Sequence, residues 1–204
     1  VLLRHALGQQ AGAAWVLKQV YDVNGDPILG SFVDLNDDGS ITEADRYYKA
    51  IQPNWTFGFG VNMNYKNWDL SASFRGQLDG QIYNSRQLTH GAIDNAKSQD
   101  GTFFINSLNF LNGGANPVFT EILDPVQYSD YFLEGASFLR CENIVLGHTL
   151  NNLLKNASVK IYGAVNNPFL ITNYSGQDPE NFTGIDTNFY PRATVYNFGV
   201  TIDF

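Results

Sequence analysis

The most regular feature of the chain is an alternation of apolar and polar residues between positions 55 and 78. From Trp55 to Tyr65 the odd positions are apolar or aromatic, and the even positions are Thr, Gly or Asn. From Trp68 to Leu78 the even positions are apolar or Gly, and the odd positions are polar or charged. Alternation at period two predicts strands with one apolar face. The short connector Lys66–Asn67 predicts a β-hairpin between them.

The second half of the chain contains further segments of strand type. Val159–Val165 and Tyr196–Phe204 alternate cleanly. Phe138–Leu150 changes phase, because Leu139 and Cys141 fall on one face while Ile144, Leu146 and Leu150 fall on the other. A bulge near Asn143 would bring these apolar residues onto a single face. A weak sixth strand is expected at about Ala14–Val20.

The connectors between these strands alternate between short and long. Residues 66–67 and 151–157 are short, whereas about 21–54, 80–137 and 166–194 are long. This asymmetry is typical of membrane β-barrels, which have short periplasmic turns and long extracellular loops. We therefore expect an antiparallel up-and-down meander whose last strand ends at the periplasmic rim.

The strands of a soluble β-sandwich also alternate between apolar and polar residues. The kinds of residue on each face therefore have to distinguish a sandwich from a membrane barrel. The apolar faces carry no charged residue, and the opposite faces consist mostly of Thr, Ser, Gly and Asn. Aromatic residues mark strand ends, where barrels have aromatic girdles: Trp55, Tyr65, Trp68, Tyr196 and Phe204. These observations favour a transmembrane barrel. A secreted, soluble calcium-binding β-sandwich or carbohydrate-adhesion module is the alternative.

Five or six strands cannot close a barrel by themselves, since the smallest common ones have eight. An open edge in lipid would leave backbone groups unpaired. The chain also begins with Val1 and shows no signal segment. Residues 1–204 are therefore expected to be the C-terminal portion of a larger barrel, in which residues 21–54 form an extracellular loop.

Composition narrows the functional classes. The 204 residues carry a net charge of -8, so no basic patch points to a nucleic-acid partner. The single cysteine, Cys141, excludes an internal disulfide framework. Neither G-x-S-x-G nor H-E-x-x-H occurs, and the prediction is that the chain is not an enzyme. Asp178 and Glu180 are expected to be solvated or calcium-loop-like carboxylates in loops rather than catalytic groups.

One loop has calcium-type spacing. Residues Asp34 to Asp45 follow D-x-N-x-D-G-x5-D, which places oxygen ligands at alternating positions around a glycine turn. The predicted Ca²⁺ ligands are Asp34, Asn36, Asp38, the Ser40 carbonyl, Thr42 (through water) and Asp45. The competing interpretation is a solvated Asp/Asn/Gly turn. A paired EF-hand is excluded because no helix precedes the loop, and at most Thr42–Ala50 is expected to be helical. The predicted role of the ion is structural.

Two further groups of side chains are candidates for substrate contact. Asp69, Arg75, Gln77 and Lys160 lie on the polar faces and would line the barrel lumen. The aromatic loop residues Tyr83, Phe103, Phe104 and Tyr174 would either stack on sugar rings or pack loop against loop.

Several longer stretches together resemble the C-terminal end of SusC/RagA-like TonB-dependent outer-membrane transporters, over about Lys18 to Phe204. The matching stretches are Tyr48-Lys-Ala-Ile-Gln-Pro-Asn-Trp-Thr-Phe-Gly58, Ser137-Phe-Leu-Arg140 with Asn143-Ile-x-Leu-Gly147, Asn173-Tyr-Ser-Gly-x-Asp-Pro-Glu180, Gly184-Ile-Asp186, Tyr190-Pro-Arg192 and the closing Phe198-Gly-Val-x-Ile-x-Phe204. The Asp34–Asp45 loop also resembles one at this place in the family. Pro168 departs from the family pattern and leaves the start of the last long loop uncertain.

The resemblance implies a multi-pass β-barrel of 22 strands in the Gram-negative cell outer membrane, of which this chain supplies the last five or six. It also implies TonB-dependent import of glycans or peptides for nutrient uptake as part of a SusCD-like complex. The implied partners are the remainder of the barrel and its plug, a SusD-like surface lipoprotein, TonB acting through the plug, outer-membrane lipid and the substrate.

Overall fold

The computed structural model describes residues 2–92, 126–154, 157–181, 183–187 and 190–203. It divides into two compact units, each assembled from three separate stretches of chain. The loop unit consists of Val1–Gln52, Asp79–Ala136 and Tyr174–Phe189, and the sheet unit of Pro53–Leu78, Ser137–Asn173 and Tyr190–Phe204. Among the described residues, no helix has both the length and the apolar character needed to cross a membrane.

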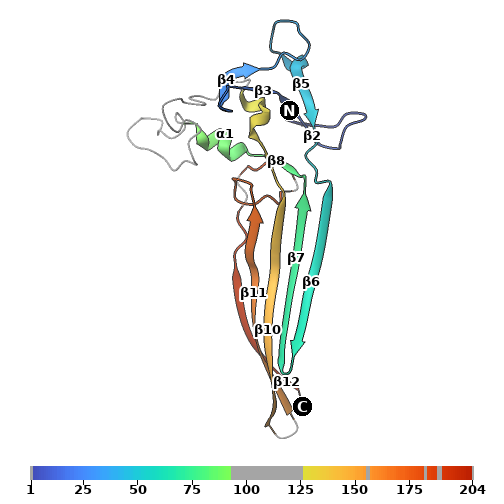
Figure 1. Cartoon of the computed structure of the whole chain (residues 1–204), viewed down its shortest axis with the longest axis vertical. Helices are drawn as coiled ribbons and strands as arrows, with labels where there is room; N and C mark the ends of the chain where they lie inside the picture. The colour runs from blue at the N-terminus through green and yellow to red at the C-terminus, as the bar shows by residue number, and fades with distance from the viewer. Residues whose placement is uncertain (1, 93–125, 155–156, 182, 188–189, 204) are drawn as a thin grey trace, which may run out of the picture. The chain divides into compact units, whose positions relative to one another are not determined.

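The sheet unit is a single five-stranded antiparallel sheet in the order β12-β11-β10-β7-β6 (Figure 1). Its strands are β6 (Trp55–Tyr65), β7 (Trp68–Leu78), β10 (Phe138–Leu154), β11 (Ala157–Thr172) and β12 (Val195–Asp203). The predicted hairpin is confirmed with its predicted bounds, and Lys66 adopts the left-handed conformation (φ 53°) at its turn.

The predicted phase change in β10 is confirmed as a β-bulge. The register with β7 shifts between Cys141 and Asn143, where Glu142 is the additional residue of β10. The register with β11 shifts at the same place, where Asn167 and Pro168 lie opposite Glu142. As a result Leu139 pairs with Gly76 and Ile144 pairs with Ala72, which lie on the same face of β7. One extra residue therefore restores a continuous apolar face in a strand whose sequence changes phase.

Strand β11 is longer than predicted, and the expected loop from residue 166 does not begin there. The strand continues to Thr172, and Leu170 pairs with Arg140 of β10. Pro168 lies where the ladder with β10 is already irregular, because Asn167 and Pro168 stand opposite Glu142, and Asn167 has a left-handed φ of 52°. Proline lacks an N–H for the ladder and is tolerated in strands at bulges. The proline therefore lies at a bulge inside the strand instead of ending it.

The loop unit contains the predicted long loops, but these have secondary structure of their own. One sheet has the order β1-β2-β5, and two further pairs are β3-β4 and β8-β9. The strands are β1 (Leu3–Arg4), β2 (Ala13–Leu17), β3 (Gln19–Tyr21), β4 (Pro27–Phe32), β5 (Arg46–Lys49), β8 (Gln81–Tyr83) and β9 (Leu133–Gly135). In the described part of this unit, the helical segments are α1 (Ser85–Gly91) and three short 3₁₀ turns, η1 (Glu43–Asp45), η3 (Val126–Tyr128) and η4 (Asp130–Phe132).

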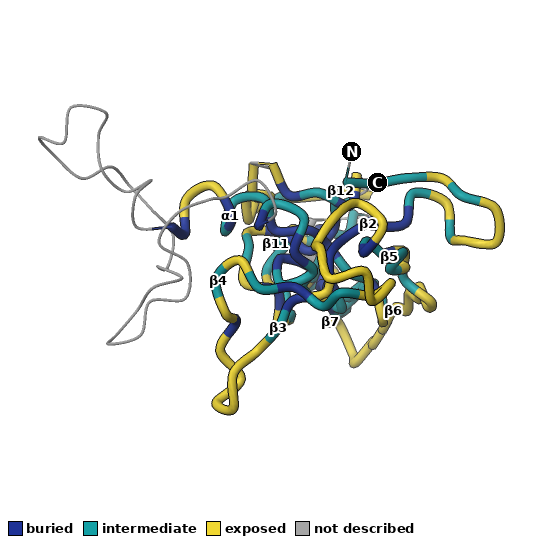
Figure 2. Tube along the Cα trace, turned by 90° about the horizontal axis from the view of Figure 1, so that it is seen from above, coloured by how far each residue is buried: buried dark blue, intermediate teal, exposed yellow. Residues whose placement is uncertain are grey.

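Two predictions for this unit are confirmed in part. The weak sixth strand exists as β2, but it belongs to the loop unit and not to the five-stranded sheet. Its five residues are all buried (Figure 2), as expected for a short continuous apolar run. The short helix expected over Thr42–Ala50 is limited to Glu43–Asp45, because Arg46–Lys49 pairs with β2 as a strand.

The core of the loop unit is built from residues of distant segments. Val16, Phe32, Tyr83 and Phe132 belong to one buried cluster. Gln19, also buried, donates from its side-chain amide to the carbonyls of residues 20, 28 and 31 and accepts from the Ser129 hydroxyl at 2.8 Å. Because these carbonyl and side-chain groups have hydrogen-bond partners, irregular backbone can be buried here without a large free-energy cost.

The packing around Gly76 makes a specific prediction about stability. A Cβ at this position would lie 2.5 Å from the Phe138 carbonyl oxygen and 2.6 Å from the Phe57 ring, and the carbonyl cannot move without disturbing the β10 ladder. Gly76→Ala should therefore destabilise the full-length protein by about 1–3 kcal/mol. Thermal unfolding followed by circular dichroism would measure this. Gly60→Ala, whose Cβ would make only an ordinary 3.6 Å contact, is the matched control, and equal melting of the two variants would contradict the prediction.

Candidate functional site

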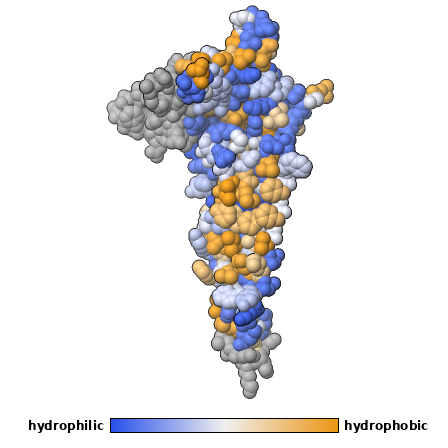
Figure 3. All heavy atoms as spheres, viewed as in Figure 1, coloured by the Kyte–Doolittle hydropathy of each residue, from blue (hydrophilic) through white to orange (hydrophobic). Residues whose placement is uncertain are grey.

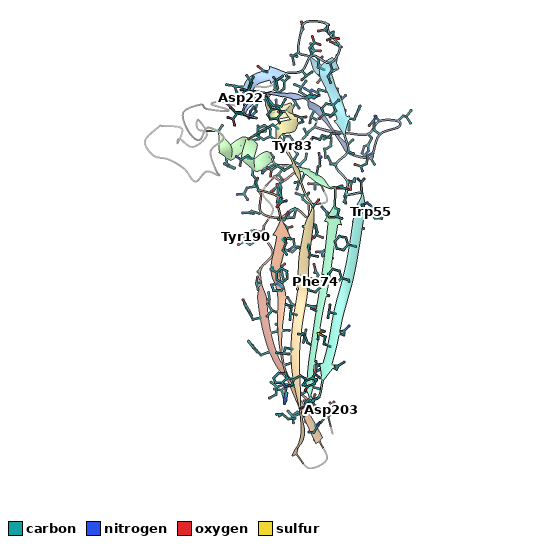
Figure 4. The ribbon with its side chains drawn as sticks, in the orientation of Figure 1. Asp22, Trp55, Phe74, Tyr83, Tyr190 and Asp203 are labelled. Atoms are coloured by element: carbon teal, nitrogen blue, oxygen red, sulfur yellow. The ribbon has the colours of Figure 1, made fainter. Side chains whose placement is uncertain are left out.

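The register of the sheet unit gathers its large apolar side chains on one face, here called the apolar face. Each strand contributes alternate residues, and paired residues form rows across the sheet. One row contains Phe59, Phe74, Cys141 and Phe169, in which the Phe59 and Phe74 rings stack at 4.8 Å. Apolar side chains gather along the sheet (Figure 3), and Phe74 lies midway along β7 (Figure 4).

This apolar face is exposed. Phe59 is 49% exposed, Met63 59% and Phe198 87%. A soluble sandwich would cover such a face with a second sheet, and exposed apolar patches of this extent mark contact with a partner or a membrane. Within the sheet unit, therefore, the exposed face fits contact with an apolar environment.

Four of the five aromatic residues predicted at strand ends lie in the described part of the chain. Tyr65 pairs with Trp68, and Trp68 packs edge-on against His148 at 4.3 Å. Trp55 begins β6, and Tyr196 lies next to the first residue of β12. The two strand starts are staggered, because the ladder connects Tyr196 to the middle of β6. Phe204, the fifth predicted member, lies outside the described residues.

The opposite face of the sheet is polar, and the predicted lumen residues Asp69, Arg75, Gln77 and Lys160 all lie on it. The Lys160 Nζ lies 2.8 Å from the Asp69 carboxylate, two strands away. The lysine can cross the intervening strand because Gly147 leaves room: a Cβ there would lie 2.6 Å from both partners. Arg75 of β7 forms a second ion pair on this face with Glu142, the bulge residue of the adjacent strand β10.

The calcium-type loop is organised around Asp45. Its carboxylate accepts hydrogen bonds from the backbone N–H of Thr42 at 2.7 Å and of Leu35 at 2.9 Å. The Thr42 hydroxyl in turn accepts from Ala44 N, so that the two residues form a capping box on the 3₁₀ turn. The hydrogen bond from the Thr42 backbone is the main cause that lowers the pKa of Asp45. This carboxylate is therefore ionised at neutral pH, as a cation ligand must be.

The other predicted ligands are only partly brought together. Asp34 accepts from Gly39 N through one oxygen, and its side chain interacts with Asp45. Its Oδ1 is buried and has no hydrogen-bond partner among the described residues. Asn36 and Asp38 bond to each other at 2.9 Å, and Asp38 also accepts from Ser40 N. Within the described ranges, no three His, Cys, Asp or Glu side chains form a group that could hold a metal. The donor set is nevertheless all oxygen, the kind Ca²⁺ prefers.

The loop carboxylates Asp178 and Glu180 are buried, so the expectation that they are solvated was wrong. The Asp178 side chain accepts from the Glu180 backbone N–H at 2.9 Å. Nearby Asp186 is also buried and accepts from the Tyr174 hydroxyl at 2.7 Å. Burial raises the pKa of Tyr174, with Asp186 adding to the effect, and this phenol therefore remains a proton donor. The segment is thus a structural part of the loop unit.

Two aromatic loop residues that were candidates for sugar stacking are instead core residues. Tyr83 is 2% exposed and Tyr174 is 5% exposed, so each ring packs against protein. Phe103 and Phe104 lie outside the described residues. Of the two possibilities predicted for these aromatics, packing of loop against loop holds for the two that are described.

Sequence reasoning missed a polar cluster around Asn84. Its side chain caps α1 by accepting from Gln87 N at 2.9 Å and donates to Glu134 at 2.7 Å. Glu134 accepts as well from the backbone and hydroxyl of Ser175. The N-cap signal Asn84-Ser85 before a helical segment was present in the sequence. The partners could not have been identified, since they lie about 50 and 90 residues away.

Comparison with known proteins identifies the class. No protein-family model matches the chain. It is 37% identical over 207 residues to "TonB-dependent receptor SusC" of Bacteroides thetaiotaomicron, covering 98% of this chain and 20% of that protein. It is 26% identical over 200 residues to "TonB-dependent receptor P3" of Formosa agariphila, covering 89% of this chain and 19% of that protein. The chain spans about a fifth of the length of these curated relatives.

Solved structures show the same fold. The RagAB peptide importer in its open-open state matches with a TM-score of 0.63 at 24% identity, covering 94% of this chain and 22% of that one. The closed-closed state matches with a TM-score of 0.65 at 17% identity, covering 98% and 24%. The described part is mostly antiparallel β with one α-helix, and its similarity in fold to these structures supports a β-barrel fragment. Among TonB-dependent receptors, the 37% identity to SusC over 98% of the chain places it in the SusC/RagA-like family.

The two faces of β6 give a sharp test of this assignment. Val61→Arg places a charge on the apolar face near mid-strand, where contact with lipid would cost about 2–4 kcal/mol. Asn62→Arg places the same charge one residue away on the polar face and should be tolerated. The measurement is the fraction of full-length protein that migrates as folded barrel on unheated SDS gels. Equal yields of folded barrel from the two variants would show that the apolar face does not contact lipid.

Proposed function

We propose that the chain is part of the transmembrane wall of an outer-membrane, TonB-dependent importer of glycans or peptides. The observation that carries this proposal is the five-stranded sheet with one exposed, uncharged apolar face and one polar face bearing ion pairs. An apolar face toward lipid and a polar face toward the lumen are the two requirements of a barrel wall. The relatives are transporters and receptors rather than enzymes, which agrees with a transport role.

The open edges of the sheet require further strands. Strands β6 and β12 lie at the two edges and pair on one side only. In lipid each unpaired backbone group would cost several kcal/mol, so the edges must continue into neighbouring strands. The proposal is that the remainder of a 22-stranded barrel supplies them and that a plug fills the lumen next to the polar face.

The proposed partners follow from the relatives. The similarity to SusC and to the RagAB complexes supports assembly with a SusD-like surface lipoprotein, and the similarity to two TonB-dependent receptors supports energy coupling through TonB. The RagAB structures are of a peptide importer, so peptides are one substrate class, and glycans are the other class proposed here.

Import can be tested in cells that express the full-length protein. Uptake of labelled oligosaccharide and oligopeptide mixtures should require both the protein and TonB. It should also stop when the inner-membrane proton gradient is collapsed by an uncoupler. Uptake that persists without TonB would indicate a passive pore and would contradict the proposal. The substrate class is the mixture whose uptake is lost when the gene is deleted.

We further propose that the Asp34–Asp45 loop binds Ca²⁺ as a structural ion. The supporting observation is that a buried carboxylate oxygen of Asp34 lacks a hydrogen-bond partner next to the ionised Asp45. Two adjacent carboxylates repel unless a cation or a proton lies between them. The ligands would be Asp34, Asn36, Asp38, the Ser40 carbonyl, Thr42 and Asp45, and the ion would order the turn around Gly39.

The calcium proposal predicts a difference between neighbouring aspartates. Asp34→Asn removes a proposed ligand, whereas Asp37→Asn removes the same charge from a non-ligand position whose left-handed φ of 58° asparagine accepts. With millimolar Ca²⁺, the unaltered loop and the Asp37→Asn loop should resist limited proteolysis, and the Asp34→Asn loop should be cleaved several-fold faster. Chelation should remove this difference. Cleavage rates that do not respond to Ca²⁺ would contradict an ion in the loop.

A further inference from the structure

The loop unit contains a cavity that the transport proposal does not use. Its volume is about 340 Å³, within the range of small-ligand sites. It is lined by the tip of the calcium-type loop, the end of β2, the start of β5 and the 3₁₀ turn η3. The lining residues are Leu17, Ile41, Thr42, Glu43, Arg46, Gln127 and Tyr128.

Arg46 is the main charged group in the wall of this cavity. Its guanidinium lies 3.6 Å from the centre of the Tyr128 ring and 4.7 Å from that of Trp15. The two aromatic rings make cation–π contacts with the planar guanidinium. Its N–H groups point outward within that plane and need hydrogen-bond acceptors there. Arg4 covers Trp15 as well, at 3.4 Å. Stacking of this kind fixes the orientation of an arginine at little entropic cost.

Two nitrogens of this guanidinium lack hydrogen-bond acceptors among the described residues. The Arg46 side chain is only 8% exposed, and within the described part of the chain its Nε and Nη1 have no hydrogen-bond partner. The nearest carboxylate, Glu43, lies 3.6 Å from Nη1, too far for a hydrogen bond, and its side chain is 67% exposed. Unmade hydrogen bonds of a buried charged group cost more than those of a neutral one. A ligand that supplied two acceptor oxygens would remove this cost.

The charge balance favours an anionic ligand. Arg4 and Arg46 place two cations around one indole ring, whereas the acidic group paired with Arg46 is the mostly exposed Glu43. The planar fork of arginine matches the two oxygens of a carboxylate. The apolar side chains Leu17 and Ile41 would contact the carbon skeleton attached to it.

We infer that this cavity binds the carboxylate of a small solute through Arg46, and that Glu43 competes with the ligand for the same guanidinium. The carboxylate could belong to an acidic peptide side chain or to a uronic acid, because both present the same planar group. The inference goes beyond the proposed transport function and does not depend on it, since equilibrium binding requires neither TonB nor a proton gradient.

The test is isothermal titration calorimetry on the full-length protein in detergent. The acidic probes are acetyl-Ala-Glu-Ala-amide and methyl galacturonoside, and the neutral counterparts are acetyl-Ala-Gln-Ala-amide and methyl galactoside. At least one acidic probe should bind, and its neutral counterpart should bind about tenfold more weakly or not at all. Binding of only one acidic probe identifies the source of the carboxylate. Failure of both, or equal binding of the neutral counterparts, would overturn the inference.

Three variants separate a binding role from a structural one. Arg46→Lys keeps the charge but loses the planar fork and should weaken binding about tenfold, whereas Arg192→Lys, the same change at an exposed residue of the sheet unit, should leave it unchanged. Glu43→Gln removes the competing carboxylate and should tighten binding several-fold, which a purely structural role for Arg46 would not produce. Unchanged or weaker binding by Glu43→Gln would overturn the competition. Thermal melting of each variant verifies that it is folded.

Discussion

Each strand of the sheet unit can form its backbone hydrogen bonds only with neighbouring strands, and this constraint organises the rest of the structure. Every strand must hold a register with its neighbour, because a shift of one residue would move its apolar side chains to the polar face. The ladder from β6 to β12 keeps that register through an irregularity at which Glu142 of β10 lies opposite Asn167 and Pro168 of β11. The bulge preserves the separation of the faces in β10, whose sequence changes phase.

Much of the sheet could be predicted from the sequence because its physical determinant is local. Alternation at period two gave the bounds of β6 and β7, and the phase change near Asn143 gave the bulge. The extension of β11 past Pro168 could not be foreseen, since a proline in a sequence ordinarily argues against a strand. Its tolerance depends on the left-handed Asn167 and on pairing with β10, which no local pattern reveals.

The loop unit was harder to predict because its stability comes from contacts between distant segments. Asp178, Glu180 and Tyr174 have the composition of a solvated loop, yet all three are buried. The strand β2 was recognised, but its sheet was not, because a short apolar run has no face that indicates its neighbours. For the candidate sites, the spacing of Asp34 to Asp45 identified a compact turn. The stacked Arg46 depends on Trp15 and Tyr128, which come from remote parts of the chain.

The stagger between β6 and β12 has a geometrical consequence. The ladder connects Tyr196 through Val165, Ile144 and Ala72 to Val61. Tyr196 is therefore displaced from the level of Trp55 by about six residues, or roughly 20 Å, across four strand spacings of about 4.8 Å each. The displacement falls on β12, because Trp55 pairs with Leu78 while Phe138 pairs with both Gln77 and Thr172, which keeps the ends of the other four strands nearly level. Beyond Asn166, strand β11 therefore pairs with β10 alone among the described strands.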